Sequence, residues 1–174
     1  AAHGITLIDR DFVEPSNLQR QVLFDGADAL EYLPQAEAAR RKIALFNSTI
    51  AVHAHIADLV PANIHELLAP AQIVLDATDN FETRYLINDF SVEQAKPWIY
   101  AAAIGAYGAT MNILPMAAIH APWQPTACLA CIFPKPPSGP VETCDTSGIL
   151  ATAVNLAASI QVTEALKFLT SQSH

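Results

Sequence analysis

Two short apolar runs in this chain each end at an aspartate. Ile5-Thr6-Leu7-Ile8 precedes Asp9, and Ile73-Val74-Leu75 precedes Asp76. Strands of a parallel sheet are buried on both faces, so they form continuous apolar runs. Helical patterns alternate with such runs along the chain. The sequence therefore predicts an α/β fold with a doubly wound, mostly parallel, Rossmann-like sheet.

The remaining pattern extends this prediction over residues 1–174 as one domain. Further strands are expected at residues 51–56, 98–104 and 109–114, and helices at 27–46 (interrupted near Pro34), 63–68, 81–94 and 148–169. Residues 115–147 are rich in proline, cysteine and turn residues, which predicts a long surface loop. Long loops in compact domains are usually functional or disordered.

Charge and composition exclude several classes of protein. The formal net charge is −8, and residues 40–42 form the only basic cluster, which argues against nucleic-acid binding. No apolar run approaches the roughly 20 residues of a membrane span, and no signal peptide is visible. Together with three cysteines, this favours a cytoplasmic, reducing location.

Acidic residues follow the first strand at Asp9 and Asp11. A carboxylate at the tip of such a strand holds a ribose hydroxyl in Rossmann-type sites, with a glycine-rich turn roughly 20 residues upstream. Only four residues precede the strand here. The alternative is an ordinary turn, in which aspartate is common.

A polar cluster continues this segment at Ser16, Asn17, Arg20 and Gln21. The amides offer donors and acceptors, and the arginine offers a planar fork suited to phosphate oxygens. The alternative is a solvated helix N-terminus with Ser16 as its cap.

Asp79 and Asn80 lie just beyond the second strand, where α/β sheets bind ligands. Asp79 could hold a Mg²⁺ that bridges ATP phosphates, because this ion prefers oxygen ligands. Either residue could instead cap the helix that follows.

The cysteines offer two further kinds of site. Cys128 and Cys131 form a C-x-x-C that supplies half of a tetrahedral zinc site, or else two free thiols. Cys144 precedes a long helix and is either a nucleophile or an inert loop cysteine.

Six segments, taken in order, resemble the ThiF/MoeB/HesA family, bacterial relatives of the ubiquitin-activating enzymes. The sequences of residues 143–149 and 161–169 are most similar to those of the thiamine-pathway ThiF branch. The matching segments are D-x-D-x-V-x-x-S-N-L-Q-R-Q at 9–21, D-A-T-D-N-F-E-T-R at 76–84, P-W-I-Y…G-A-Y-G at 97–108, C-L-A-C at 128–131, T-C-D-T-S-G-I at 143–149 and Q-V-T-E-A-L-K-F-L at 161–169.

The resemblance implies an adenylyltransferase with added antiparallel strands in its sheet. Such an enzyme uses ATP and Mg²⁺ to adenylate the C-terminal glycine of a ubiquitin-like sulfur carrier, ThiS- or MoaD-like, in thiamine or molybdopterin biosynthesis. A sulfur donor enzyme is a further expected partner, and a homodimer is the expected assembly.

The resemblance also assigns roles to the candidate residues. Asp9 and Asp11 would hold the ribose, and Asp79 the Mg²⁺ with Asn80 beside it. Cys128 and Cys131 would be two of four zinc ligands, and Cys144 would take part in sulfur or acyl transfer. The nucleotide and its phosphates would be lined by Ser16, Asn17, Arg20 and Gln21.

Three departures from the family pattern leave other functions open. The glycine-rich turn and a second C-x-x-C lie outside this sequence, so we expect a domain truncated at both ends. Gln35 stands where the family has a lysine that contacts ATP phosphates, and it lacks that charge. A weakened paralogue or scaffold that binds a carrier is therefore one alternative. A relative acting on a tRNA base or a peptide is another, and a simple NAD-binding domain is disfavoured.

Overall fold

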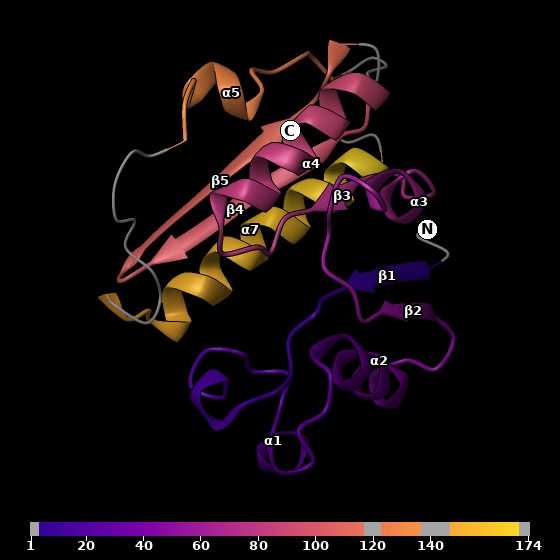
Figure 1. The fold of residues 1–174 in the computed structure, drawn as a ribbon, viewed down its shortest axis with the longest axis vertical. Helices are drawn as coiled ribbons and strands as arrows, with labels where there is room; N and C mark the ends of the chain where they lie inside the picture. Colours follow the sequence, from indigo (N-terminus) through magenta and orange to yellow (C-terminus); the bar gives the residue numbers. More distant parts are fainter. Residues whose placement is uncertain (1–3, 117–122, 137–146, 171–174) are drawn as a thin grey trace. The chain divides into compact units, whose positions relative to one another are not determined.

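The chain divides into two compact units, each with its own sheet. The structure is a computed structural model that describes residues 4–116, 123–136 and 147–170 (Figure 1). Unit 1 comprises Ala1–Leu59 and unit 2 comprises Val60–His174. Within the described residues, no helix combines the length and the apolar character that crossing a membrane would require.

Unit 1 is built around a parallel pair of strands. Strands β1 and β2 run in register from Gly4 opposite Ala51 to Ile8 opposite His55, and α2 packs against both strands. The predicted helix at 27–46 is divided at Pro34, because proline cannot continue a helix through its interior. The elements are β1 (Gly4–Ile8), the 3₁₀ helix η1 (Pro15–Asn17), α1 (Gly26–Leu30), α2 (Gln35–Phe46) and β2 (Ala51–His55).

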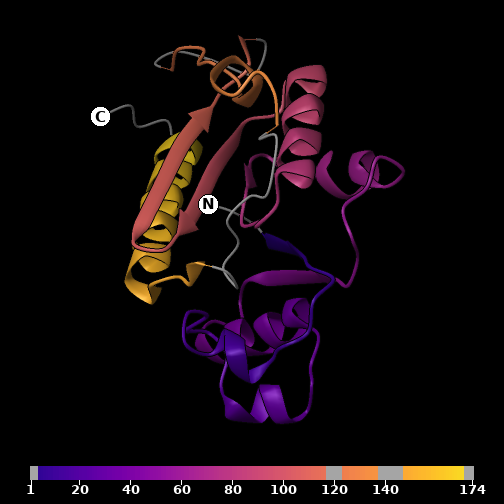
Figure 2. The ribbon, with the colours of Figure 1, turned by 60° about the vertical axis from the view of Figure 1, so that its left-hand side comes forward.

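Unit 2 has a three-stranded mixed sheet. Strand β4 pairs in parallel with β3 and antiparallel with β5. Figure 2 shows α7 and α4 on opposite sides of these strands. The elements are α3 (Ile64–Leu68), β3 (Val74–Leu75), α4 (Phe81–Gln94), β4 (Trp98–Ile104), β5 (Tyr107–Ile113), α5 (Leu129–Ile132) and α7 (Ala151–Leu169).

Close packing brings α7 onto this sheet. A side chain at Gly108 of β5 would place its Cβ 3.4 Å from the Cβ of Ala157. The core beneath α7 and α4 includes Trp98, Ile99 and Ile113, all of which are fully buried. These buried strands fix the backbone that leads to the end of β3.

The predicted combination of parallel strands with an added antiparallel strand is confirmed, but the loop prediction is wrong in part. Within residues 115–147 the chain forms the short helix α5. Its first residue, Leu129, is completely buried, and its backbone amide donates to Asn88 Oδ1 at 2.7 Å. This helix depends on contacts with α4, which a local sequence pattern does not record.

Candidate functional site

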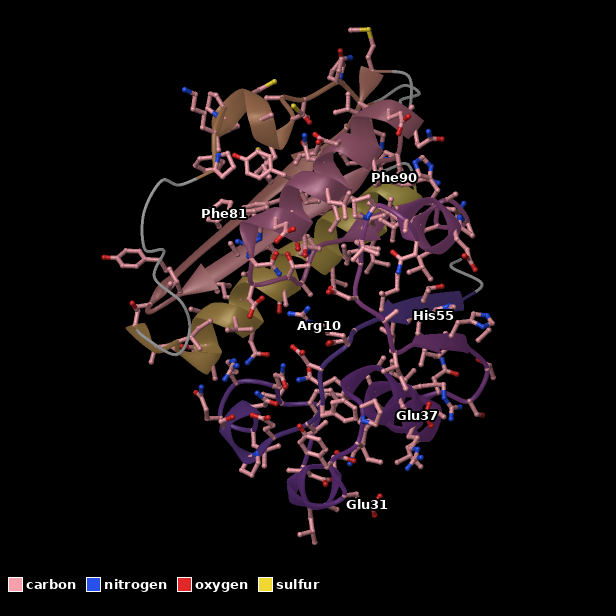
Figure 3. All side chains as sticks on the ribbon, in the orientation of Figure 1. Arg10, Glu31, Glu37, His55, Phe81 and Phe90 are labelled. Atoms are coloured by element: carbon pink, nitrogen blue, oxygen red, sulfur yellow. The ribbon has the colours of Figure 1, made fainter. Side chains whose placement is uncertain are left out.

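In unit 1, Asp9 shapes the loop that leaves β1. Its backbone amide donates to His55 O at 3.1 Å, and its Oδ1 accepts from the Asp11 amide at 2.9 Å. Such an aspartate turn directs the chain away from the strand. Arg10, labelled in Figure 3, pairs with Asp58 at 2.7 Å. The loop therefore presents the exposed carboxylate of Asp11 beside the half-buried Asp9.

The segment after this turn forms η1 instead of the start of an α-helix. Asn17 is buried, and its Oδ1 accepts from the Glu14 amide at 2.9 Å. Ser16 lies inside η1 and its hydroxyl donates to Glu14 Oε2 at 3.4 Å. The alternative in which Ser16 caps a helix is therefore wrong, because Glu14 occupies the capping position.

Gln35, at the start of α2, joins this loop into a network of amides. Its Nε2 donates to Phe12 O at 3.2 Å and to Asn17 Oδ1 at 3.4 Å. Its Oε1 accepts from Gln21 Nε2 at 3.0 Å. Gln35 is only 8% exposed. The side-chain amide of Gln35 therefore uses its hydrogen bonds to stabilise the loop.

A cavity of about 260 Å³ opens beside this network. The rings of Phe12 and Tyr32 stack at its wall, with centroids 4.8 Å apart. Two carboxylates and two amides also line the cavity, and none of its lining residues is a cation. The lining residues are Asp11, Phe12, Glu14, Asn17, Tyr32 and Gln35.

Arg20 differs from the other cations described in unit 1. Its Nη1 donates to the backbone oxygen of Ser16 at 3.2 Å, and it has no carboxylate partner among the described residues. The other cations of the unit, Arg10, Arg40, Arg41 and Lys42, are all in ion pairs. Arg20 can therefore meet an incoming anion without first breaking an ion pair.

In unit 2, an exposed carboxylate lies between a strand and a helix. Asp79 is exposed, and its Oδ1 is 3.5 Å from Asn80 Nδ2. Asn80 is the N-cap of α4, since its Oδ1 accepts from the Thr83 amide at 2.8 Å. Asp79 is not the cap and keeps its oxygens accessible. One exposed carboxylate suits Mg²⁺, which is usually bound by one or two carboxylates together with phosphate and water oxygens.

Two buried charged residues to which the sequence assigns no role lie on either side of Asp79 along the chain. Asp76 and Arg84 are 1% and 6% exposed, and Arg84 Nε lies 3.5 Å from Asp76 Oδ2. Burial raises the pKa of Asp76, against the opposing effects of the Arg84 charge and the hydrogen bonds from Thr78. Both residues belong to the motif at 76–84, and that motif is the only signal for them in the sequence.

The two thiols of the C-x-x-C also converge. Cys128 Sγ and Cys131 Sγ lie 3.4 Å apart. Burial alone would raise the pKa of Cys128, but hydrogen bonds from Cys131, from the Ala130 backbone and from Asn88 outweigh it and lower the pKa. This geometry fits two thiolate ligands on one tetrahedral ion.

The structure brings no further metal ligand to these thiols within the described parts of the chain. No group of three or more histidine, cysteine, aspartate or glutamate side chains that could hold a metal is present there. Cys144, the predicted transfer residue, lies outside the described residues.

The chain is similar over nearly its whole length to two curated bacterial proteins. It is 42% identical to "Sulfur carrier protein ThiS adenylyltransferase" of Bacillus subtilis, over 97% of this chain and 48% of that protein. It is 36% identical to "Sulfur carrier protein adenylyltransferase" of Thermus thermophilus, over 95% of this chain and 59% of that protein. The chain thus spans about half the length of the curated relatives it matches.

Solved structures and a family model agree with this similarity. The crystal structure of Escherichia coli MccB with ATP superimposes with a TM-score of 0.77 at 22% identity, covering 98% of this chain and 50% of that one. At that identity the likeness shows the fold. The model of the ThiF family matches residues 2–174. A match across almost every residue places this chain in the ThiF family.

Proposed function

We propose that the protein to which this chain belongs adenylates the C-terminal glycine of a ubiquitin-like sulfur-carrier protein with ATP. The observation that carries this proposal is the 42% identity, over 97% of the chain, to the ThiS adenylyltransferase of B. subtilis. A relative in Haloferax volcanii, 34% identical over 95% of this chain, is named "SAMP-activating enzyme E1". Thiamine biosynthesis is the favoured pathway, and molybdopterin biosynthesis is the alternative.

The proposed reaction breaks the phosphoanhydride bond between the α- and β-phosphates of ATP and forms an acyl phosphate bond. A carrier carboxylate oxygen attacks the α-phosphorus of ATP, the bond to the β-phosphate oxygen breaks, and pyrophosphate leaves with its electron pair. A sulfur nucleophile from the donor enzyme can then attack the acyl carbon, which forms the carbon–sulfur bond, breaks the acyl phosphate bond and releases AMP. Carboxylate and triphosphate repel each other, so the main task of the protein is to hold them together.

Unit 1 supplies groups suited to the nucleotide. Asp9 and Asp11 would accept hydrogen bonds from the ribose hydroxyls. Ser16, Asn17 and Gln21 would line the nucleotide. Arg20 supports the proposal most directly on physical grounds, because its guanidinium has no carboxylate partner in the described part of the chain and offers a planar fork to phosphate oxygens.

Unit 2 supplies the exposed carboxylate. Asp79 would coordinate Mg²⁺ in the proposed complex, with Asn80 shaping the start of α4. The ion, when bound, would neutralise phosphate charge. Cys128 and Cys131 would provide two of four zinc ligands, and Cys144 would act in transfer. We also propose that the protein forms a homodimer.

The test is ATP–pyrophosphate exchange by the full-length protein with a carrier that ends in Gly-Gly. Arg20→Ala should lower exchange by about 100-fold, as removal of one donor to developing charge commonly does. Arg41→Ala is the matched control, because Arg41 is already paired with Glu37 at 2.9 Å. Absence of exchange by the unmodified protein would refute the proposal.

A second candidate is a weakened relative that binds a carrier without efficient adenylation. The observation that favours it is Gln35, whose amide is bonded to the loop and carries no charge. If this candidate is correct, Gln35→Lys should raise exchange and tighten ATP binding in the full-length protein. Efficient exchange by the unmodified protein would eliminate this candidate.

A further inference from the structure

Buried side chains fix the residue that precedes Asp79 at all three of its polar groups. Asp76 Oδ1 accepts from the Thr78 amide at 2.8 Å and from the Thr78 hydroxyl at 2.7 Å. Arg84 Nη2 donates to Thr78 O at 2.5 Å. The residue that follows Asp79 is fixed as well, because Asn80 caps α4. Asp79 is therefore an exposed side chain on a restrained backbone.

Arg84 is itself held in place. Its guanidinium carbon lies 5.5 Å from the centre of the Phe81 ring and 5.3 Å from that of Tyr100. Phe81, the first residue of α4, is labelled in Figure 3. A guanidinium packed between two rings gains cation–π attraction and loses freedom to rotate. Its contact with Thr78 thus has one defined geometry.

The backbone of Asp76 is anchored from α7. Gln161 is buried, and its Nε2 donates to Asp76 O and to Ile99 O, both at 2.7 Å. One side chain therefore ties the end of β3 to β4. The turn that carries Asp79 is connected to α4, to α7 and to the sheet.

We propose that Asp76 and Arg84 are positioning residues that hold Asp79 in the orientation needed to bind a Mg²⁺–nucleotide complex. This inference rests on the proposed function. A buried ion pair is weak support for stability, because desolvation commonly offsets its attraction. The positioning role follows instead from the hydrogen bonds that Asp76 and Arg84 make with all three polar groups of Thr78. Groups that orient a metal ligand typically change metal affinity by 10–100-fold when they are mutated.

The test uses Arg84→Lys and Asp76→Asn in the full-length protein. Each keeps a polar side chain of similar size, and circular dichroism checks that each variant is folded before its metal dependence is compared with that of the unmodified protein. Two readouts are compared: the Mg²⁺ concentration for half-maximal pyrophosphate exchange, and the fraction of Mn²⁺ bound in the presence of ATP by electron paramagnetic resonance. We expect about a 10-fold or larger weakening in both, with exchange largely restored at saturating Mg²⁺.

Lys96→Met is the matched control. Lys96 lies just beyond the far end of α4 and donates to Ala69 O at 2.9 Å and to Ala71 O, so it also joins a cation, here half-buried, to backbone oxygens. Its loss should lower stability and leave the metal dependence unchanged. Asp79→Asn removes the proposed ligand itself, so its metal affinity is the lowest value expected for any of these variants.

The outcomes separate this inference from the proposed function. Metal dependence in Arg84→Lys and Asp76→Asn equal to that in Lys96→Met would overturn the positioning role. Binding of Mn²⁺–ATP that weakens as expected, without any exchange by the unmodified protein, would support the positioning role and refute adenylation. No Mn²⁺–ATP binding by the unmodified protein would overturn both.

Discussion

The loop after β1 and the turn after β3 begin in the same way and are stabilised differently. In each, the first aspartate accepts a hydrogen bond from the amide two residues later, at 2.9 Å for Asp9 and 2.8 Å for Asp76. Beyond that bond, neutral amides around Gln35 hold the first loop, whereas the buried Arg84 holds the second. An aspartate at the end of a strand therefore predicts a turn, but it does not predict which further contacts stabilise that turn.

This difference has an energetic consequence. Neutral hydrogen bonds contribute about 1 kcal/mol each, so loss of the Gln35 network should be tolerable. A buried charge left without its partner costs several kcal/mol, so the second turn should depend strongly on each member of its pair. Three substitutions test this contrast.

The largest effect is expected for Arg84→Met. It leaves Asp76 buried with no cation beside it, and we expect the free energy of unfolding to fall by about 3–5 kcal/mol at pH 7. Urea denaturation followed by circular dichroism measures this change. The double variant Asp76→Leu/Arg84→Met should recover much of the loss, because an apolar pair leaves no buried charge. A loss below about 1 kcal/mol for Arg84→Met would show that the pair is effectively solvated.

A smaller effect is expected for Gln35→Leu. The substitution removes the partner of Phe12 O and of Gln21 Nε2, and one of the two donors to Asn17 Oδ1, which should cost about 1–3 kcal/mol. The same denaturation experiment applies. Gln19→Leu is the control, because Gln19 is exposed in the same segment and should change stability by less than about 0.5 kcal/mol. Equal losses for the two variants would mean that the amide network does not stabilise the loop.

The contrast between these turns also explains how far the sequence could predict the molecule. The pattern at 81–94 predicts α4 with its observed bounds, because Asn80 supplies a local cap and Pro97 a local stop. Periodicity and turn chemistry are local properties, so such elements are accessible from the sequence. The sequence does not predict helix α5, because the hydrogen bond between the Leu129 amide and Asn88 Oδ1 is a tertiary contact.

The candidate site follows the same division. The sequence indicates Asp9 and Asp79 as candidates because each lies just beyond a predicted strand, and their roles in binding stay predictions. Arg84 had no assigned role, because an arginine on an amphipathic helix is ordinarily solvent-exposed. Its burial depends on Phe81 of the same helix, on Asp76 of the preceding turn and on Tyr100 of β4. The contact with β4 joins segments that are not adjacent in the sequence. A resemblance can name such a motif, but only the structure shows how its members are paired.

The smallest effect is expected for Glu37→Gln on α2, a surface counterpart to the buried pair. Hydrogen bonds from Arg40 and Arg41 lower the pKa of Glu37 from 4.5 to about 2. A carboxyl whose pKa is lowered on folding stabilises the folded state above its unfolded pKa and loses this contribution as pH falls through its folded pKa. The substitution should therefore cost less than about 1 kcal/mol at pH 7, because exposed ion pairs are screened by solvent. The cost should shrink between pH 4.5 and about 2, and disappear below this range.

Urea denaturation at pH 7, 4 and 2.5 measures this dependence on α2. Glu66→Gln on α3 is the control, because Glu66 is exposed and belongs to no ion pair among the described residues. This variant makes the same change of side chain without removing an ion pair among the described residues. A Glu37→Gln cost that stays constant from pH 7 to pH 2.5 would assign the effect to helix propensity or packing. In that case Arg40 and Arg41 would be as available to an incoming anion as Arg20. The lack of an ion pair would then no longer single out Arg20 as the candidate phosphate ligand of unit 1.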